Sequence, residues 1–352
     1  MVKERFYVNK TGFELFDAFR VYGLAFTISG FQAMPEVKIV DSGYAYYIDV
    51  IDGSISKSPD PELFAEVSNW INAFGKEKTR KDAKKKPTKM ACEEVLNKEY
   101  GKILDLYSHS DFFPQIGSLS KNSETLSQII DISASKGFRE EKIGTTYHEG
   151  SQLYVDKYSW AVACVGRAFF GAQIIRGGRK KGYILTLVPN PKKVILHEQR
   201  QLQSDLDLSG LCGLSPNGTL VHYAIKLYLL LTKKRRNIQY DTVIFNALRK
   251  TSQKPKPSGG GKYSLNFLEA ISMSHYGIEI LKELDKQFAS SDTKGIRQDV
   301  GYVLTDFLLR PTLENLRTYE RLYILGQINE KQKFFPWEKE QWEVILKHVE
   351  IT

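Results

Sequence analysis

The stretch WAVACVGRAFFGAQ, which runs from Trp160 to Gln173, mixes large apolar side chains with very small ones. Its small residues include Ala161, Ala163, Gly166 and Ala168. Two helix axes approach more closely where the side chains between them are small. The stretch therefore predicts a helix that packs tightly against a neighbouring element of the core.

A basic turn and a strand are expected directly after this helix, in RGGRKKGYILTLVPNPKKV (Arg176–Val194). Gly177 and Gly178 allow positive φ angles and a close approach of the backbone. The apolar run Tyr183–Val188 has the composition of a strand, and prolines follow it. We predict a cationic turn, a strand over Tyr183–Val188 and a proline-bounded exit.

The N-terminal part is expected to consist of strands and turns around one short helix. In GFELFDAFRVYGLAFTISG, Phe16, Phe19 and Tyr22 recur at a helical spacing before the apolar run Leu24–Ile28 begins. Further along, VKIVD and YAYYIDVIDG lie on either side of Ser42-Gly43. Aromatic and β-branched residues that flank such a dipeptide predict a β-hairpin.

Helical periodicity returns in later parts of the chain: Pro59–Trp70, Met90–Leu106, Thr219–Leu231 and most of Ser264–Val349. Mixed elements come first and helices last. This order predicts the α+β class, with a mixed α/β N-terminal and central part that has antiparallel strands, followed by a mainly helical C-terminal part.

The domain boundary is expected within Lys254–Lys262, where proline and glycine cluster. Residues 1–255 would form an α+β part for nucleic-acid binding and subunit docking. Residues 263–352 would form a helical C-terminal part.

The composition of the 352-residue chain excludes several protein classes. With 42% hydrophobic and 26% charged residues, it is typical of a globular protein with a real core. Apolar runs such as Ala224–Leu231, interrupted by Lys226, are too short to span a membrane, and the charged start lacks a signal-peptide core. Cys92, Cys164 and Cys212 are too far apart for a disulfide scaffold or a zinc site, which favours the reducing cytoplasm.

No familiar catalytic pattern is found in the sequence. The histidines stand singly, at positions 109, 148, 197, 222, 275 and 348, and are expected to be ordinary surface or core residues. The glycines Gly259–Gly261 and the following Lys262 lack the preceding strand and the Ser or Thr after the lysine that a phosphate loop requires. Carboxylate pairs such as Asp49 with Asp52 have no evident partners for a two-metal site. We predict a non-enzyme without metal or cofactor.

Positive charge is concentrated in three segments, Lys76–Lys89, Arg176–Lys181 and Lys233–Lys262. The chain has 50 Lys and Arg against 41 Asp and Glu, a formal charge of +9. Each phosphate that a Lys or Arg neutralises releases counterions, which drives nucleic-acid binding whatever the base sequence. A single lysine run is equally well explained by a solvated surface, but three such segments beside ordered structure favour contact with nucleic acid.

The first two segments offer different contacts. Lys76–Lys89 is dominated by lysine and suits attraction to a phosphate backbone. The arginines of Arg176–Lys181 can also hydrogen-bond guanine edges. The residues predicted to bind nucleic acid, over all three segments, are Lys84, Lys85, Lys86, Arg176, Arg179, Lys180, Lys181, Lys233, Lys234, Arg235, Arg236, Asn237, Gln239, Arg249, Lys250, Lys254, Lys256 and Lys262.

The third segment, Lys233–Lys262, divides into parts. Its first cations follow a helix, whose C-terminal dipole they complement. Thr242–Phe245 is expected to be a strand that anchors the segment, with Tyr240 offering a stacking face for a base and Asn246 projecting outward. Lys254–Lys262 is expected to be a mobile Pro/Gly loop that becomes ordered when nucleic acid binds.

Three stretches of the chain resemble the large subunits of CRISPR Cascade surveillance complexes, with subtype I-A the closest. They are FDAFRVYGLAFTISG with the hairpin VDSGYAYYIDV, then VACVGRAFFGAQIIRGGRKKGYILTLVPNPKKV, and finally LVHYAIKLYLLL followed by YDTVIFNALRKTSQKPKPSGGGKYSLNFLE. The resemblance lies in the order of the predicted elements and in the kinds of residue that compose each of them. Residues 277–352 add only a compatible helical tail.

The resemblance implies a non-catalytic subunit that reads the protospacer-adjacent motif on duplex DNA, assists duplex opening and R-loop formation, and helps to recruit a helicase-nuclease. The implied partners are crRNA, target double-stranded DNA, the crRNA-handle-binding subunit, backbone subunits, a small subunit and the helicase-nuclease. The motif-reading residues are expected in the turn Arg176–Lys181, together with Asn237, Gln239 and the Lys254–Lys262 loop.

Two alternatives stay open at this point. Besides a DNA-reading subunit, the chain could be a basic scaffold subunit that binds only crRNA and protein partners, or, as a weaker alternative, a nuclease whose site has no recognised pattern. Salt-dependent binding to bare duplex DNA separates a DNA reader from a scaffold. Metal-dependent cleavage would favour the nuclease.

Overall fold

The computed structural model of the chain describes residues 3–65, 68–70, 88–117, 125–126, 154–178, 181–234, 238–252, 256–292, 294–329 and 337–350. It divides into two compact units. The first unit comprises Met1–Arg200, Asn237–Tyr240 and Ile244–Gly261, and the second comprises Gln201–Arg236, Asp241–Val243 and Lys262–Thr352. Thus the helical residues from Gln201 to Arg236 group with the C-terminal helices.

Strands dominate the early elements and helices the late ones, which confirms the predicted α+β class. The elements are β1 (Glu4–Asn9), α1 (Glu14–Ser29), β2 (Glu36–Asp41), β3 (Ala45–Asp52), the 3₁₀ turn η1 (Pro61–Phe64), α3 (Thr88–Ser108), β4 (Ile116–Gly117), β5 (Thr125–Leu126), β6 (Tyr154–Asp156), α5 (Lys157–Phe170), β7 (Ala172–Arg176), β8 (Tyr183–Ile195), α6 (Leu196–Asp205), α7 (Pro216–Lys234), β9 (Gln239–Arg249), β10 (Lys256–Ser264), α8 (Asn266–Ser272), α9 (Gly277–Ser290), α10 (Ile296–Leu309), α11 (Leu313–Asn329) and α12 (Lys339–Lys347).

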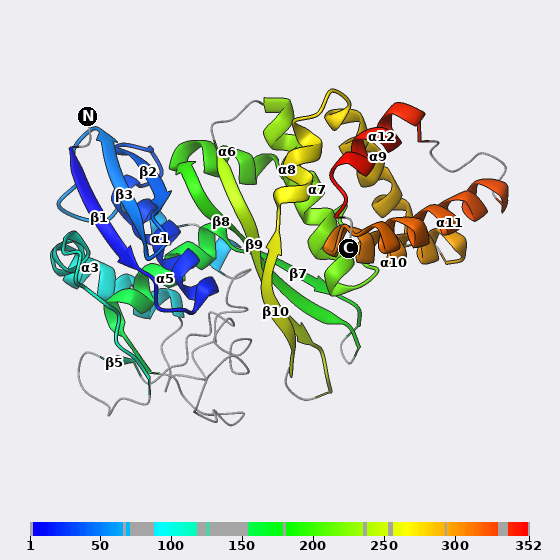
Figure 1. Cartoon of the computed structure of the whole chain (residues 1–352). Coiled ribbons are helices and arrows are strands. Elements are labelled where there is room, and N and C mark those ends of the chain that lie inside the picture. Colours follow the sequence, from blue (N-terminus) through cyan, green and yellow to red (C-terminus); the bar gives the residue numbers. More distant parts are fainter. Residues whose placement is uncertain are drawn as a thin grey trace. The chain divides into compact units, whose positions relative to one another are not determined.

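The main sheet has the strand order β1-β3-β2-β8-β9-β10, with β7 paired beside β8, seven strands among the described residues (Figure 1). The pairs β1 with β3, β2 with β3, β2 with β8 and β7 with β8 are all antiparallel. A small second sheet joins β4, β6 and β5. The predicted hairpin around Ser42-Gly43 is confirmed as β2 and β3, with Gly43 at φ +93° in the turn.

The helix predicted from the small-residue stretch is α5, and its neighbour is α1. A Cβ atom placed on Gly166 would lie 1.8 Å from the carbonyl oxygen of Phe19, and one on Gly23 would lie 1.8 Å from that of Val162. The two backbones are therefore in direct contact, at a distance that only glycine permits at both positions. The predicted tight packing is confirmed.

The helix α1 is longer than the sequence pattern predicted. The run Leu24–Ile28 continues the helix to Ser29, and every residue from Leu15 to Ser29 is buried. A helix buried on all sides has no polar face, so its sequence looks like a continuous apolar run and its length is easily underestimated. The expectation of a short helix that ends before the apolar run Leu24–Ile28 was wrong.

The strand β8 also runs further than predicted, through Pro189 and on to Ile195. It pairs with β7 over Tyr183–Leu187 and with β2 only from Lys193 onward. The prolines, which cannot donate a backbone hydrogen bond, fall in the gap between these two pairings. The tyrosine hydroxyl of Tyr22 donates to the carbonyl of Pro189 at 3.0 Å, which holds this gap against the core. The predicted proline-bounded exit was wrong for this reason.

The segment predicted as a mobile Pro/Gly loop is, from Lys256 onward, the strand β10. The Ser258 hydroxyl donates to the carbonyl of Ala247 on β9 at 3.1 Å. Gly259 and Gly261 have φ angles of +157° and +150°, which side-chain-bearing residues rarely adopt. These glycines allow an irregular extended backbone within a strand. The prediction of a loop was therefore wrong for Lys256–Lys262. Residues 253–255 lie outside the described ranges.

The second unit is a set of packed helices, as predicted for Thr219–Leu231 and for the C-terminal part. Its core includes a buried aromatic cluster in which Trp337 donates its indole N–H to the hydroxyl of Tyr319 at 2.9 Å. The 3₁₀ turn η1 and the helical residues 68–70 account for the described part of Pro59–Trp70. The predicted helix Met90–Leu106 is confirmed as α3.

Candidate nucleic-acid interface

The predicted cationic turn exists, between β7 and β8. Gly177 has φ +75° and Gly182 has φ +126°. A Cβ atom on Gly182 would lie 2.1 Å from the carbonyl oxygen of Arg176, and one on Gly177 would lie 2.4 Å from that of Lys181. Both glycines are therefore required for the turn to close. Arg179 and Lys180 lie outside the described residues.

The end of β9 is tied to this turn by Lys250. Its backbone N–H donates to the carbonyl of Gly182 at 2.8 Å. Its ammonium group donates to the carbonyl of Gly177, 73 residues earlier in the chain, at 3.1 Å. Two of the three predicted basic segments are thus brought side by side within the first unit.

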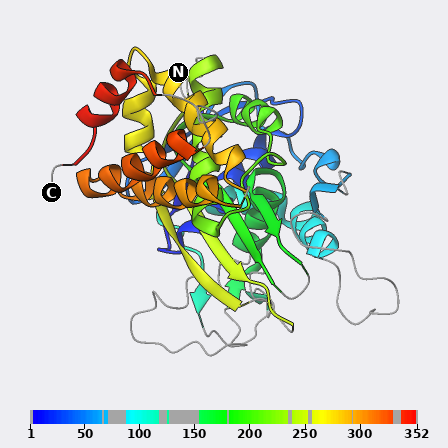
Figure 2. The same cartoon turned by 90° about the vertical axis from the view of Figure 1, so that its right-hand side faces the viewer.

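We call the resulting cluster of Arg176, Lys181, Arg249 and Lys250 the basic hairpin end. Lys181 and Arg249 are exposed, and Arg176 and Lys250 are partly exposed. The hairpins β7–β8 and β9–β10 project in the same direction, as Figures 1 and 2 both show. Concentrated cations at the tips of two neighbouring hairpins suit contact with phosphate groups.

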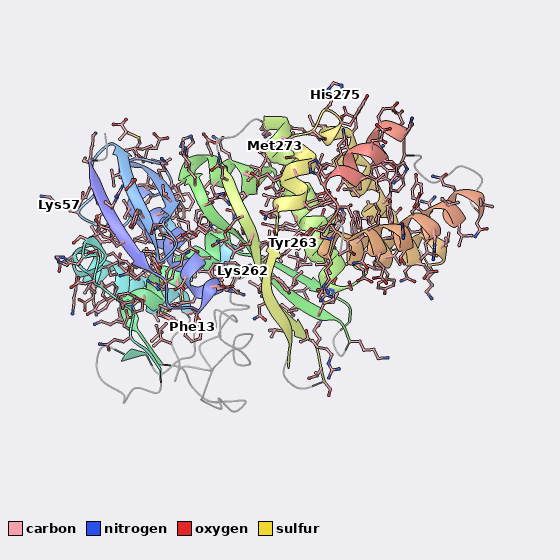
Figure 3. All side chains as sticks on the ribbon, viewed as in Figure 1. Phe13, Lys57, Lys262, Tyr263, Met273 and His275 are labelled. Atoms are coloured by element: carbon pink, nitrogen blue, oxygen red, sulfur yellow. The ribbon has the colours of Figure 1, made fainter. Side chains whose placement is uncertain are left out.

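The other predicted cations are distributed differently. Lys233 and Lys234 form the last turn of α7, as expected, and Lys234 pairs with Asp205. Gln239 is exposed at the start of β9. Figure 3 labels Lys262 and Tyr263 on β10, where the lysine is exposed and the tyrosine buried. Outside the described residues lie Lys84, Lys85, Lys86, Arg235, Arg236, Asn237 and Lys254, and the side chain of Lys256 is likewise not described.

Two residues of β9 do not take the roles expected of them. Tyr240 is only 2% exposed, and its hydroxyl donates to Gln199. Asn246 is 1% exposed. Alternate residues of β9 share one face of the strand, and Tyr240, Ile244, Asn246 and Leu248 on that face are all buried. The predictions that Tyr240 stacks on a base and that Asn246 projects outward were wrong.

A surface that sequence reasoning missed lies on the outer face of β1, β3, β2 and β8. Strand alternation directs Phe6, Val8 and Ile48 into the core. On the opposite side of these strands, the register aligns eight side chains in two rows, which we call the outer sheet face. One row contains Tyr7, Tyr47, Val40 and Lys193, and the other contains Arg5, Asp49, Lys38 and Ile195. The alternation of β1 and β3 was the signal that could have revealed it.

The outer sheet face has an ordered centre. The rings of Tyr7 and Tyr47 meet edge to face, with centroids 5.5 Å apart. The guanidinium of Arg5 lies 4.8 Å from the centroid of the Tyr47 ring and donates to Asp49 at 2.6 Å and 3.1 Å. The hydrogen bond with Asp49 raises the pKa of Arg5 above its ordinary value. Arg5 is therefore held over an aromatic ring by a fixed pair of hydrogen bonds.

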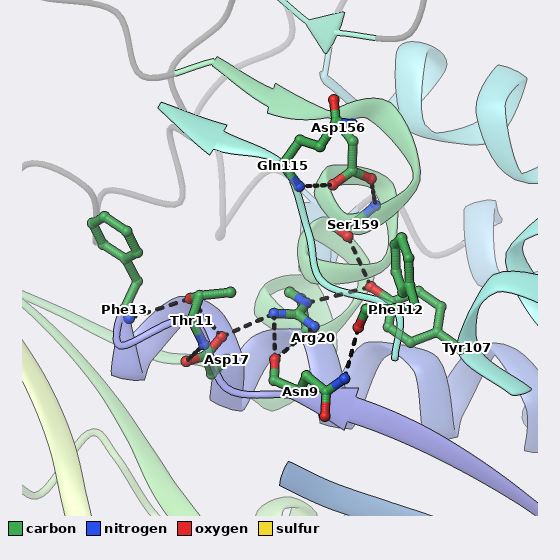
Figure 4. A network of polar contacts seen from close by, with 10 residues as sticks. All are labelled: Asn9, Thr11, Phe13, Asp17, Arg20, Tyr107, Phe112, Gln115, Asp156 and Ser159. Atoms are coloured by element: carbon green, nitrogen blue, oxygen red, sulfur yellow. Dashed lines mark hydrogen bonds and ion pairs between the residues drawn. The ribbon is translucent and has the colours of Figure 1, made fainter. Parts of the chain in front are cut away.

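A buried polar network lies between α1, α3 and α5 (Figure 4). Arg20 is completely buried and donates to Asp17 at 2.9 Å, to the carbonyl of Asn9 at 3.1 Å and to the hydroxyl of Tyr107 at 3.3 Å. Tyr107 is in turn 3.0 Å from the hydroxyl of Ser159. Burial raises the pKa of Asp17 to about 6, although Arg20 acts in the opposite direction.

The second unit contains a buried histidine, His222. Its Nδ1 accepts from the backbone N–H of Cys212 at 2.9 Å, and its Nε2 lies 2.8 Å from Asp285. Burial lowers the pKa of His222 below its ordinary value. Lys226 lies 3.3 Å from the same carboxylate. Both ring nitrogens are used by the fold, so His222 is the core histidine that the sequence predicted.

Within the described part of the chain, no group of three or more His, Cys, Asp or Glu side chains is placed to hold a metal ion. In the same residues, no helix combines the length and the apolar character needed to cross a membrane.

Comparison with known proteins finds a similarity that extends over nearly the whole chain. No family model matches the chain. It is similar to a protein of Archaeoglobus fulgidus, described as uncharacterized, with 26% identity over 366 aligned residues. The alignment covers 99% of this chain and 98% of the archaeal protein, so the similarity includes both units.

Proposed function

We propose that the chain is the non-catalytic large subunit of a cytoplasmic CRISPR RNA-guided surveillance complex. In this role it reads the protospacer-adjacent motif on duplex DNA, assists duplex opening and R-loop formation, and helps to recruit the helicase-nuclease. The proposal combines the resemblance described above with the basic hairpin end.

The observation that carries the proposal is the contact of Lys250 with the β7–β8 turn. The lysine side chain reaches Gly177 at 3.1 Å, and its backbone reaches Gly182 at 2.8 Å. Cations from two distant basic segments thereby meet at one end of the sheet. A purely solvated surface has no need for such a convergence, whereas a duplex-binding surface requires several cations within reach of consecutive phosphates.

The two kinds of cation would have different tasks. Lysines such as Lys181 act as point charges that neutralise phosphates, and this supplies affinity. Arginines such as Arg249 can form paired hydrogen bonds with the N7 and O6 atoms of guanine in the major groove. The proposal therefore expects motif discrimination to depend on arginine more than on lysine.

Duplex binding of the purified full chain, measured over a series of salt concentrations, tests the proposal. The variant Lys181→Ala/Arg249→Ala removes two exposed cations of the basic hairpin end, and Lys57→Ala/Lys98→Ala removes two exposed lysines elsewhere in the first unit. Each lost phosphate contact should reduce the slope of log K against log salt by about 1. We expect a reduction of about 1 for the first variant if Arg249 contacts guanine, or about 2 if it also contacts a phosphate, and no change for the second.

Other outcomes would favour the alternatives. If the wild-type chain shows no salt-dependent binding to bare duplex, it is a scaffold that binds only crRNA and proteins. Cleavage of the duplex in the presence of Mg²⁺ or Mn²⁺ would instead indicate a nuclease. Unchanged motif-dependent binding after charge reversal of Arg179 and Lys180 would remove the β7–β8 turn from the proposal.

A further inference from the structure

We infer that the outer sheet face is a binding site for single-stranded nucleic acid, separate from the basic hairpin end. It shares with the proposed function only the class of ligand, nucleic acid. The inference rests on the residues that strand register aligns on the four strands β1, β3, β2 and β8.

The first argument is the pair of tyrosines at the centre of this face. Tyr7 on β1 and Tyr47 on β3 are directly paired in register and are both partly exposed. Sheets that bind single-stranded RNA present aromatic side chains on neighbouring strands, and unpaired bases stack on them. A pair of half-buried tyrosines is also the arrangement expected of a stacking platform, because its rings are already held in place.

Arg5 adds a second planar surface. Its guanidinium lies against the ring of Tyr47, and the two hydrogen bonds with Asp49 fix its orientation. The Arg5 side chain is 40% exposed, whereas the Asp49 side chain is 7% exposed. The plane of a fixed guanidinium is a surface on which a base can stack, so the carboxylate orients the arginine and the arginine faces the ligand.

The strands β2 and β8, away from the tyrosines, each contribute a lysine to the outer sheet face. Lys193 on β8 is exposed and follows Val40 in the row of the tyrosines, and Lys38 on β2 lies in the row of Arg5. Four strands at about 4.8 Å spacing place the first and last positions of a row roughly 14 Å apart. That span suits two or three nucleotides, with bases over the aromatic side and phosphates over the lysines.

This composition favours a single strand over other occupants. Stacking on a protein ring requires unstacked bases, which a duplex does not offer. The buried centres of protein interfaces are depleted of charge, whereas this face has Arg5, Lys38 and Lys193 among its eight positions. A protein strand would pair with a sheet edge, and these side chains lie on a face.

Binding of the full chain to a ten-nucleotide oligouridylate RNA and to the matching oligothymidylate DNA tests the inference. The variant Tyr7→Leu/Tyr47→Leu keeps apolar bulk but removes both rings, whereas Tyr7→Phe/Tyr47→Phe keeps the rings. We expect the leucine variant to bind the preferred oligonucleotide roughly 10- to 100-fold more weakly, and the phenylalanine variant within about twofold of wild type. Tyr302→Leu, which alters an exposed tyrosine on α10, should have no effect.

The two surfaces can be separated in the same experiment. The leucine variant should keep its duplex binding, and Lys181→Ala/Arg249→Ala should keep its single-strand binding. A larger loss with RNA would assign the face to a guide, and a larger loss with DNA would assign it to a displaced strand. Equal binding by the leucine variant and wild type, or no single-strand binding by wild type, would overturn the inference.

Photocrosslinking gives a test that needs no substitution. Wild-type chain is bound to an oligonucleotide that carries 5-bromouracil or 5-iodouracil and is irradiated, and the modified peptides are identified by mass spectrometry. We expect adducts in the peptides that contain Tyr7 and Tyr47. Adducts confined to other parts of the chain would contradict the inference even if the leucine variant fails to fold.

Discussion

Cations of the first unit occupy two opposite environments. Arg20 on α1 is completely buried and donates to Asp17, to the backbone of Asn9 and to Tyr107 (Figure 4). Lys181 and Arg249 at the basic hairpin end are exposed. The hydrogen bonds of Arg20 are made within the fold, whereas the charges of Lys181 and Arg249 remain accessible to solvent. Cations therefore have a structural role in the first region, and the proposed function gives those of the second region a role in binding.

The largest expected effect is that of Arg20→Ala. The substitution leaves the Asp17 carboxylate and the carbonyl of Asn9 buried without their partner. Removing one member of a buried ion pair costs about 3 to 5 kcal/mol. Chemical denaturation should show this loss in the free energy of unfolding. A loss below about 1 kcal/mol would mean that the network is unimportant to the fold.

Gly166→Ala tests whether the tight helix pair is what encloses Arg20. A methyl group at this position would lie 1.8 Å from the carbonyl oxygen of Phe19, so α1 and α5 must move apart. We expect a loss of about 1 to 3 kcal/mol. Gly101→Ala is the matched control, because a Cβ atom there meets nothing within 4 Å. Equal stability of the two variants would contradict the close contact of the helices.

The titration of Asp17 predicts how the stability of the buried network depends on pH. Its pKa is raised from 3.8 to about 6, so the folded state binds more protons than the unfolded state between these values. The free energy of unfolding contributed by Asp17 is therefore largest below about pH 4 and decreases as the pH rises through 6. Denaturation at pH 5 and pH 7 should show a smaller change in Asp17→Asn than in wild type. An identical change in both proteins would assign the pH dependence to other groups.

The smallest effect on stability is expected at the basic hairpin end. Lys181→Ala/Arg249→Ala should change the free energy of unfolding by no more than about 0.5 kcal/mol, as is usual for exposed residues. The same variant should lose duplex affinity. A large destabilisation would remove the distinction between the two regions, because these cations would then also be structural.

The sequence predicted the elements of this fold better than their ends. The small residues of α5 revealed its tight packing, because a helix contact as close as that of Gly166 with Phe19 leaves no other composition possible. The length of α1 and the course of β8 past Pro189 could not be predicted. Both depend on burial and on strand partners that are distant in the sequence.

The candidate site was predictable in part. The composition of Arg176–Lys181 indicated a basic turn, but only the fold places Lys250 against it. Tyr240 illustrates the opposite failure, since it is near cations in the sequence but lies on the buried face of β9. The outer sheet face was missed because Tyr7 and Tyr47 become neighbours only through the register of β1 with β3.

Affinity purification of the natively expressed chain, followed by sequencing of the bound RNA, tests the central claim most directly. The proposed function predicts short RNAs that carry a constant 5′ handle and variable spacers from a repeat array, together with the other subunits of one complex. Recovery of the chain without such RNA and without those subunits would contradict the proposal that it belongs to an RNA-guided surveillance complex.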